Sequence, residues 1–143
     1  MADSVDRAGR WPDHLPVMQV RFARPTSALE AVAEFYRDCL GLEELYRFED
    51  HAGYDGAMLG LPGTSYHLEF TQRVGIDGAA ATKENLLVLY VGTSSALVPI
   101  AERFAARGHH PVEGENPFWA DHGALTFEDP DGWRVVVVPE AGL

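Results

Sequence analysis

In the first half of the chain, apolar residues recur first at every second position, then at every third or fourth position, and then again at every second position. Residues 17–23 alternate between apolar and polar side chains, which predicts a β-strand. Apolar residues then recur at spacings of three and four over residues 29–40, which predicts a helix with Thr26 or Ser27 as its cap and Gly41 as its end. Three further strand-like runs follow: Leu42 to Phe48, Asp55 to Leu61 and Ser65 to Gln72. The first half therefore predicts the order βαβββ.

The second half repeats this order. Residues 86–91 predict a strand, and an apolar stripe that begins after Ser94 or Ser95 and ends at Gly108 predicts a helix. Matching segments occur throughout, with an offset that changes by a single residue: Ser27-Ala28-Leu29 with Ser95-Ala96-Leu97, Gly41 with Gly108, Gly56-Ala57 with Gly123-Ala124, and 66–70 with 133–137. We therefore expect an α+β fold of two tandem βαβββ modules.

The length of the chain sets the domain boundaries. A chain of 143 residues with 46% hydrophobic and 23% charged residues is typical of one globular domain. Residues 1–15 have no apolar periodicity and are predicted to form a flexible N-terminal arm. We expect a single domain over residues 16–143, with the first module at about 16–73 and the second at about 84–139.

The net charge of −11 excludes several classes of partner. A chain this acidic repels phosphate backbones and anionic lipid surfaces, so we expect neither nucleic-acid nor membrane binding, whereas a cationic ligand is attracted. The longest uncharged stretch, residues 85–101, is shorter than the roughly 20 apolar residues that span a bilayer. The acidic N-terminus does not resemble an export signal, and the single cysteine, Cys39, fits a reducing compartment. A cytoplasmic location is the expectation.

Two motifs carry a resemblance to a known family. Residues 35–42, Phe-Tyr-Arg-Asp-Cys-Leu-Gly-Leu, end the first helix, and residues 128–134, Glu-Asp-Pro-Asp-Gly-Trp-Arg, enter the last strand. Two tandem modules with these motifs resemble the vicinal oxygen chelate superfamily, which includes glyoxalase I, bleomycin-resistance proteins, extradiol dioxygenases and methylmalonyl-CoA epimerase. The resemblance implies a cupped, partly open mixed β-sheet around a cavity, with helices on the outside, and a homodimer. Both motifs form a helix end or a turn, so they indicate the fold and leave the activity open.

Alternation assigns the cup-facing side chains of the first module. In the strand after Gly63, Leu68 and Phe70 must meet the helix together with Tyr66, so His67 and Glu69 point into the cup. The same argument and the repeat add further residues to the cup: Gln19 and Arg21 from the first strand, Leu87, Leu89 and Val91 from the second module's first strand, and Arg134, Val136 and Val138 from the last strand.

The family's metal site is expected to be incomplete. The resemblance implies His, Gln or Glu ligands near the middle of four strands, and Glu69 matches one such position. Val136 and the leucine-rich strand at residues 86–88 cannot ligate, and the guanidinium of Arg21 would repel a cation. No cofactor is therefore expected; a reduced divalent-metal site of Glu69, His67 and Gln19 with water is the alternative.

His67 and Glu69 are the candidate catalytic residues, and each also has a structural interpretation. His67 can serve as a general base, with Glu69 orienting it, or as a histidine that is hydrogen-bonded between strands. Glu69 can be the ion-pair partner of Arg21 or Arg134.

Aromatic residues supply the remaining ligand-binding candidates. Phe118 and Trp119 can roof the cup, lie in a dimer interface or pack in the core, and Tyr54 and His122 can rim the opening. The sequence thus predicts a protein that binds a small organic molecule in the cup at Gln19, Arg21, Tyr54, Phe118, Trp119, His122 and Arg134. The alternatives are a metal-dependent lyase, isomerase or dioxygenase using Glu69, and a metal-free acid–base enzyme using His67 and Glu69.

Overall fold

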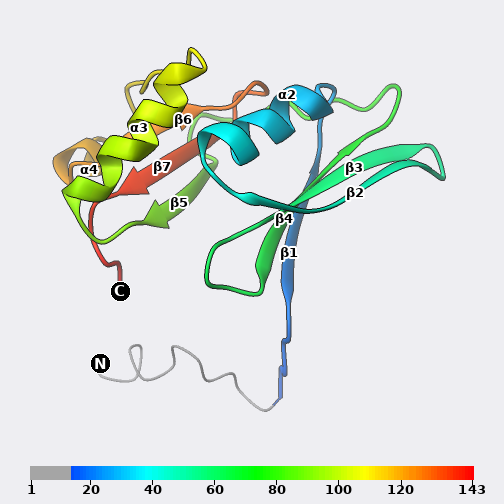
Figure 1. The fold of residues 1–143 in the computed structure, drawn as a ribbon, viewed down its shortest axis with the longest axis horizontal. Helices are drawn as coiled ribbons and strands as arrows, with labels where there is room; N and C mark the ends of the chain where they lie inside the picture. The colour runs from blue at the N-terminus through cyan, green and yellow to red at the C-terminus, as the bar shows by residue number, and fades with distance from the viewer. Residues whose placement is uncertain (1–13) are drawn as a thin grey trace.

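The computed structural model describes residues 14–143. The fold consists of two β-sheets with helices packed between and beside them (Figure 1). Most of the arm expected at residues 1–15 lies outside the described residues. The first half contains β1 (Val20–Pro25), α2 (Leu29–Glu34), a π-helical turn η1 (Phe35–Cys39), β2 (Glu43–His51), β3 (Tyr54–Gly60) and β4 (Tyr66–Gln72). The second half contains β5 (Leu86–Tyr90), η2 (Ser94–Ala96), α3 (Leu97–Ala106), α4 (Pro117–Asp121), β6 (Leu125–Glu128) and β7 (Arg134–Val138).

The first module forms a four-stranded sheet in the order β1-β4-β3-β2. β1 runs parallel to β4, whereas β3 is antiparallel to both of its neighbours. The cap expected at Thr26 or Ser27 is wrong, because the helix begins after Ala28 without a side-chain cap. The Thr26 hydroxyl instead accepts the backbone N–H of Ala28 at 3.0 Å in the turn before the helix. Gly41 ends the helical segment with φ +96°, a conformation that favours glycine. Leu68 and Phe70 are buried beneath this helix, and the Phe70 ring stacks on Tyr36 at 4.8 Å.

The second module has a three-stranded sheet in the order β5-β7-β6. The strand expected before the last hairpin is reduced to a single bridge between Val112 and Thr126. The short helix α4 lies between this bridge and β6. Asn116 caps this helix by accepting the backbone N–H of Phe118 at 2.9 Å, and Pro117 occupies its first turn, where no backbone N–H is needed.

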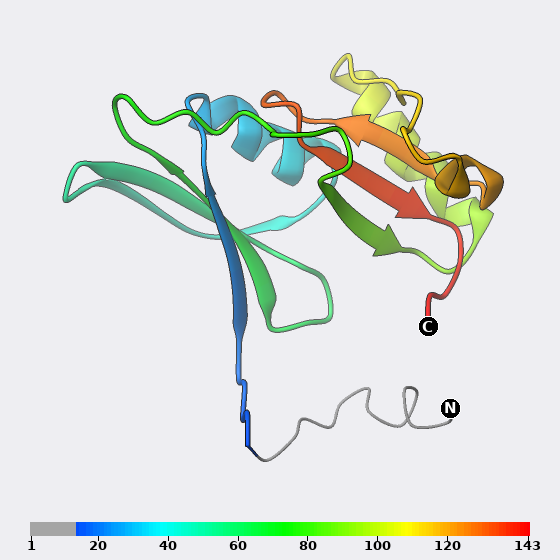
Figure 2. The ribbon, with the colours of Figure 1, turned by 180° about the vertical axis from the view of Figure 1, so that it is seen from behind.

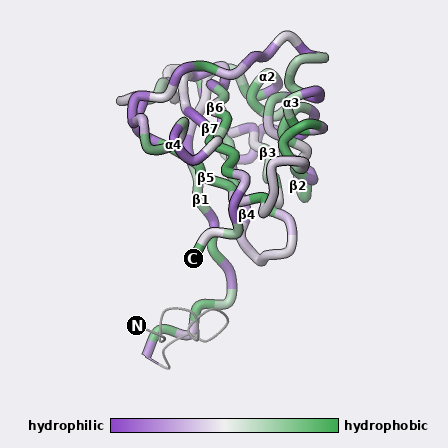
Figure 3. Tube along the Cα trace, turned by 90° about the vertical axis from the view of Figure 1, so that its left-hand side faces the viewer, coloured by the Kyte–Doolittle hydropathy of each residue, from purple (hydrophilic) through white to green (hydrophobic). Residues whose placement is uncertain are grey.

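One hydrophobic core joins the two modules. Phe35 from η1 packs edge-on against Phe104 from α3 at 5.2 Å, and Phe104 stacks on Phe127 from β6 at 3.9 Å. Figure 2 shows the second sheet lying in front of α3, so α3 covers the face of this sheet that is turned away from the viewer. Figure 3 shows the tube to be mostly hydrophobic along β5 and β7. The helix-facing sides of both sheets therefore meet in one interior, and their opposite faces lie on the outside.

A buried ion pair also connects the modules. Arg24, on β1, donates hydrogen bonds to Asp129 and, at 2.8 Å, to Asp131, in the turn between β6 and β7. The Tyr36 hydroxyl donates to the same Asp129 carboxylate at 2.7 Å. The Arg24 guanidinium also lies over the rings of Phe70, at 4.9 Å from the centroid, and Trp133, at 5.2 Å.

The connection between the modules is held at Gly78. A Cβ atom on this residue would lie 1.8 Å from the carbonyl oxygen of Pro25, so a larger residue cannot fit there without moving the backbone. The Gly78 carbonyl accepts the indole N–H of Trp133 at 2.7 Å, and the backbone N–H of Ala80 donates to the backbone carbonyl of Asp131 at 3.0 Å. The connection is thus fixed to both modules.

Candidate functional site

A polar cluster lies on the outer face of the first sheet, the face opposite the helix. Arg21 Nε donates to His67 Nε2 at 2.8 Å, and Arg21 Nη1 is 3.8 Å from Glu69 Oε2. The Glu69 side chain is 14% exposed and that of Arg21 is 46% exposed, while His67 is 4% exposed. The structure therefore brings together the three residues that alternation placed on one face.

Strand register explains why these residues meet. Arg21 on β1 is the direct partner of His67 on β4, and Ala23 is the partner of Glu69. The small Ala23 side chain leaves the space beside Glu69 to the long Arg21 side chain. Met58 on β3 faces Glu69 from the other side, and its sulfur lies 3.7 Å from Arg21 Nη2.

The hydrogen bond from Arg21 determines the tautomer of His67. Nε2 accepts the guanidinium N–H, so its lone pair is occupied and the neutral ring carries its proton on Nδ1. Nδ1 is buried and has no hydrogen-bond partner. A buried donor without a partner costs about 1–3 kcal/mol, and a ligand that brings an acceptor recovers that cost. Arg21, and not Glu69 as the sequence suggested, orients the ring.

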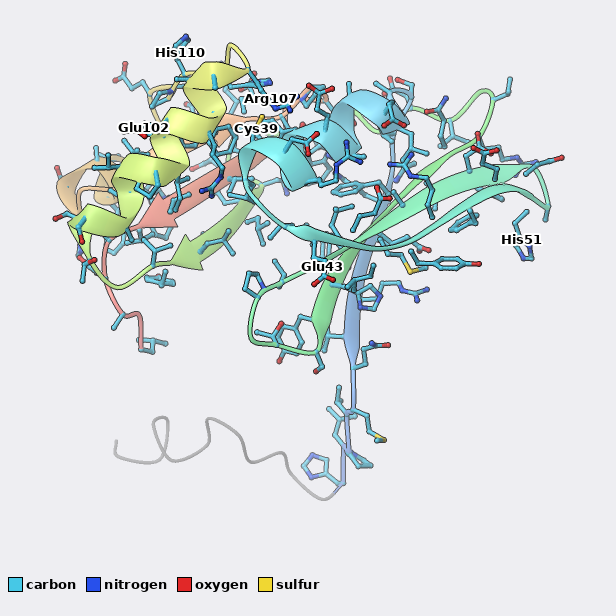
Figure 4. The ribbon with its side chains drawn as sticks, in the orientation of Figure 1. Cys39, Glu43, His51, Glu102, Arg107 and His110 are labelled. Carbon is cyan, nitrogen blue, oxygen red and sulfur yellow. The ribbon has the colours of Figure 1, made fainter. Side chains whose placement is uncertain are left out.

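His67 lines a cavity of about 430 Å³ on the same face. The cavity lies between the start of β1, the start of β2 and the β3–β4 turn, and its walls include Gln19, Glu43, Leu45 and Tyr66. Figure 4 shows Glu43 at the start of β2. The cavity thus combines an exposed carboxylate, apolar surface and the buried histidine.

Sequence reasoning identified Gln19 and His67 in this cavity but missed Glu43 and Leu45. Glu43 on β2 pairs with Gly60 on β3, and Gly60 pairs with His67 on β4, so one strand lies between Glu43 and His67. The alternation of residues 43–47 was a usable signal, but bulges in β2 shift the register and hide which face each side chain takes. Tyr66, assigned to the helix side, is the first residue of β4 and is 39% exposed.

Of the second module's candidate residues, Arg134 lines a groove of about 340 Å³ that His67 also lines. Arg134 is buried and donates to Glu128 at 3.0 Å and to the carbonyl of Glu113 at 3.0 Å. It lines a small pocket of about 150 Å³ together with Trp119 and Val136. Arg134 therefore pairs with Glu128, whereas Glu69 pairs with Arg21.

The aromatic candidates are distributed over two places. Phe118 stacks on His122 at 4.1 Å, and His122 Nδ1 lies 2.7 Å from a Glu140 carboxylate oxygen. Tyr54 lies at the β2–β3 turn, where Arg73 donates to its hydroxyl at 3.2 Å. Neither Phe118 nor His122 nor Tyr54 borders the 430 Å³ cavity.

The predicted orientation of the second module's first strand is wrong. Leu87, Leu89 and Val91 were expected to face the cup, but all three pack against the shared hydrophobic core. Leu86, which lines the small pocket, lies on the outer face instead, beside Arg134. Every residue of β5 is apolar or aromatic, so alternation could not distinguish the two faces.

The residues of this face do not fit a divalent metal ion. His67 Nε2 is occupied by Arg21, whose positive charge lies against Glu69. The position of the second module that matches Glu69 is Val136, which has no donor atom. Within residues 14–143, no group of three or more His, Cys, Asp or Glu side chains is placed to hold a metal ion.

The strand order, the outward-facing cluster and the two modules define a protein of the vicinal oxygen chelate fold, as the sequence motifs indicated. The chain belongs to the YycE-like family: the YycE-like N-terminal domain matches residues 20–71 and the YycE-like C-terminal domain matches residues 84–138. An uncharacterised YycE protein of Bacillus subtilis strain 168 is 44% identical over 126 residues, covering 87% of this chain and 90% of the relative.

Solved structures show the same fold. A Bacillus subtilis YycE protein of unknown function superposes with a TM-score of 0.81 at 42% identity, covering 87% of this chain and 91% of that chain. A glyoxylase/bleomycin resistance protein/dioxygenase domain from Frankia gives a TM-score of 0.63 at 21% identity, over 87% and 96% of the two chains. The antibiotic-binding protein TnmS3 from Streptomyces gives 0.61 at 21% identity, over 87% and 98%. None of the helices in residues 14–143 has the length and apolar character needed to cross a membrane.

Proposed function

We propose that this protein binds a small organic cation in the 430 Å³ cavity on the outer face of the first sheet. The observation that carries the proposal is the buried His67 ring, whose Nδ1–H has no partner within the protein. A ligand with a carbonyl or similar acceptor would satisfy this donor. Small-molecule sites combine apolar surface with placed polar groups, and this cavity has Leu45, Leu61 and Pro62 beside Gln19, Glu43 and His67.

Charge favours a cation over an anion. Arg21 and Glu69, near His67, neutralise each other. Among the residues that line the cavity, Glu43 is the carboxylate. The net charge of −11 adds a long-range attraction for cations. An apolar or aromatic group on the ligand would contact Leu45 and Tyr66.

The proposed site works without a metal ion. The Arg21 guanidinium takes the position beside His67 and Glu69 that a cation would need, so binding a divalent ion would require Arg21 to leave both residues. Sequestration of a ligand needs only binding, and the fold neighbour TnmS3 is an antibiotic-binding protein. We propose this role for the chain, in the cytoplasm, ahead of a metal-dependent reaction.

Three compounds that share an aminobenzamide group test the proposal: procainamide carries a cation, 4-amino-N-butylbenzamide is neutral and 4-aminohippurate is an anion. Calorimetric titration should show binding in the order cation, neutral, anion. Glu43→Gln should weaken procainamide about two- to five-fold, the size of an exposed ion pair. His67→Phe, which keeps a ring but removes Nδ1, should weaken all compounds that bind about two- to ten-fold.

Glu102→Gln serves as the control, because Glu102 is an exposed carboxylate on α3, away from the cavity. Equal affinities for the three compounds, or equal effects of Glu43→Gln and Glu102→Gln, would contradict the cation site. Titration with Zn²⁺, Mn²⁺, Ni²⁺ and Fe²⁺ tests the metal-free part. Submicromolar affinity that Glu69→Ala abolishes would favour the metal-dependent alternative.

A metal-free acid–base reaction is the second candidate, and the Nδ1–H of His67 favours it. This proton is buried and has no acceptor within the protein, and a bound molecule that reached the ring would supply one. Turnover of a bound compound that His67→Phe abolishes while binding persists would favour this candidate over sequestration.

A further inference from the structure

A strip of apolar and aromatic side chains follows β2 on the outer face of the first sheet. Tyr46 pairs with Met58, and Met58 pairs with Glu69, so Tyr46 lies in the same row across the sheet as the polar cluster. Tyr46 is 59% exposed, and Leu45, in the bulge beside it, is 52% exposed. The Phe48 ring lies 6.2 Å from the Tyr46 ring, and the two planes differ by 32°. We call Leu45, Tyr46 and Phe48 the β2 strip.

Two glycines of β3 give the β2 strip its shape. A Cβ atom on Gly56 would lie 2.2 Å from the Phe48 ring, so this ring lies directly on the backbone of β3. A Cβ atom on Gly60 would lie 3.1 Å from both terminal methyl groups of Leu45. Because neither glycine carries a side chain, the side chains of β2 can fold down onto β3. The glycines therefore allow Phe48 and Leu45 to lie close against the sheet on either side of Tyr46.

The β2 strip is continuous with the 430 Å³ cavity. Leu45 belongs to both, because it also lines the cavity. Glu43, the carboxylate of the cavity, pairs with Gly60, and Tyr46 pairs with Met58, two residues along β3. Two strand residues span about 7 Å, so this is the spacing along the sheet between the Glu43 and Tyr46 positions. Figure 4 shows Glu43 at one end of β2 and His51 at the other, and the strip lies between them.

The width of the β2 strip favours a small planar ligand over a protein partner. The intervening residues Glu44 and Arg47 pair with each other, and Arg47 also binds Glu30, next to the start of the first helix. On β3, the neighbouring Met58 sulfur is covered in part by Arg21, whose Nη2 lies 3.7 Å away. The exposed apolar surface is thus about one strand wide. A stable protein–protein interface buries about 800 Å² on each partner, which three side chains cannot supply.

We infer that the ligand of this cavity is an aromatic cation, and that its planar ring stacks on Tyr46 while its positive charge lies at Glu43. This inference rests on the proposed function. Tyr46 would determine specificity, because stacking of two aromatic rings adds to the contact that a saturated ring of the same size also makes. Gly56 and Gly60 are positioning residues, which act through Phe48 and Leu45.

Two cations that differ only in the ring test the role of Tyr46. N-(2-diethylaminoethyl)benzamide has a planar ring, and N-(2-diethylaminoethyl)cyclohexanecarboxamide has a saturated ring of similar size and the same charge. Calorimetric titration of the wild-type protein should show about two- to ten-fold tighter binding of the benzamide. Tyr46→Ser should bring this ratio to about one, and Tyr46→Phe, which keeps the ring, should retain it.

Val98→Ser is the control for the loss of an exposed apolar side chain. Val98 is 56% exposed on α3, away from the cavity, so this variant should keep the wild-type ratio. Sedimentation velocity of Tyr46→Ser provides a second check. A changed mass with an unchanged affinity ratio would assign the β2 strip to a protein contact and would overturn the inference.

Gly56→Ala tests the positioning of Phe48. The added methyl group displaces the Phe48 ring, so the affinity ratio should fall at least about two-fold, whereas the affinity for the cyclohexane compound should change less than about two-fold. Gly114→Ala is the matched control, because a Cβ atom there would meet its nearest neighbour at an ordinary contact distance of 3.5 Å. An unchanged ratio in a folded Gly56→Ala variant would overturn the positioning role.

Nuclear magnetic resonance locates the bound ring. The ring protons of the bound benzamide should shift upfield in the wild-type protein and in Tyr46→Phe, and Tyr46→Ser should abolish this shift, because the ring current of residue 46 is its source. If both cations bind the wild-type protein equally well, or if Tyr46→Ser keeps the ratio, the inference fails and the proposed function stands. If neither cation binds, the proposed function fails, and the inference fails with it.

Discussion

Arg24 carries its charge in a nearly fully buried position. Its side chain is 8% exposed, and that of its partner Asp129 is fully buried. Burial raises the pKa of Asp129, while the charge of Arg24 and the hydrogen bond from Tyr36 lower it in part. Burial is also the main cause of the raised pKa of Tyr36. Removing Arg24 would leave a buried carboxylate without its counter-ion.

Arg24→Met should therefore lower the free energy of unfolding by about 3–5 kcal/mol, the typical cost of breaking a buried ion pair. Arg47→Met is the control, because Arg47 pairs with the partly exposed Glu44 and Glu30, and such pairs contribute about 0–1 kcal/mol. Urea unfolding of both variants measures the difference. Similar losses in the two would show that the Arg24 pair contributes no more than a surface pair.

The Arg24→Met loss should depend on pH. A carboxyl whose folded-state pKa lies above its unfolded value contributes stability that is present below the unfolded value, 3.8 for Asp129, and is lost as the pH rises through the folded value. Without Arg24, the pKa of Asp129 rises further. The gap in unfolding free energy between wild type and variant should then narrow as the pH falls from 7 towards about 4. A gap that widens would contradict this sign.

At the scale of elements, a surface network ties the end of the first helix to β2. Arg37 in η1 binds Asp38 at 2.9 Å and Glu44 on β2 at 3.1 Å, and Arg47 binds Glu44 at 2.6 Å. The hydrogen bond from Arg37 lowers the pKa of Asp38, and the hydrogen bond from Arg47 is the main cause of the lowered pKa of Glu44. Folding thus lowers the pKa values of Asp38 and Glu44, whereas it raises that of Asp129.

Glu44→Gln should reduce the loss of unfolding free energy that occurs as the pH falls. The folded-state pKa of Glu44 lies below the usual 4.5, so its contribution is present above pH 4.5 and is lost as the pH falls through the folded value. The effect should be below about 1 kcal/mol, because the pair is partly exposed. Urea midpoints at pH 6 and pH 3.5 give the comparison, with Glu102→Gln as the control. An unchanged pH slope in Glu44→Gln would show that the pair contributes nothing to folding.

The sequence predicted well those elements whose pattern of polar and apolar residues allows only one orientation. β4 alternates between polar and apolar residues, and only one orientation buries Leu68 and Phe70, so His67 and Glu69 had to face outwards. β5 has no polar residue, and its orientation depends on packing against Phe104 and its neighbours, which alternation does not record. The helix α4 follows an Asn-Pro signal that was visible in the sequence. The repeat did not predict it, because it places residues 117–121 opposite residues 50–54, which lie between two predicted strands.

The candidate site was predictable only within a sheet. Arg21, His67 and Glu69 come from neighbouring strands of one module, where side-chain direction follows from the register. Arg134 shares the 340 Å³ groove with His67, whereas Trp119 lines the 150 Å³ pocket. The placement of the two sheets depends on contacts in the shared core, which no local pattern describes.

At the scale of the whole molecule, the shared core makes the two modules one folding unit. Phe104 is fully buried and touches Phe35 of the first module and Phe127 of the second. Phe104→Ala should lower the unfolding free energy by about 3–5 kcal/mol, and hydrogen-exchange protection should fall equally in β4 and β7. A loss confined to β7 would show that the first module folds independently.

The contacts of Gly78 and Trp133 also bear on domain swapping. To exchange second modules between two chains, each chain would have to release the Trp133–Gly78 hydrogen bond, separate Arg24 from Asp129 and open the shared core. These steps amount to global unfolding, so two folded chains that meet have no rapid route to a swapped form. Association of such chains is therefore limited by collision and docking, and each chain keeps both of its own modules throughout.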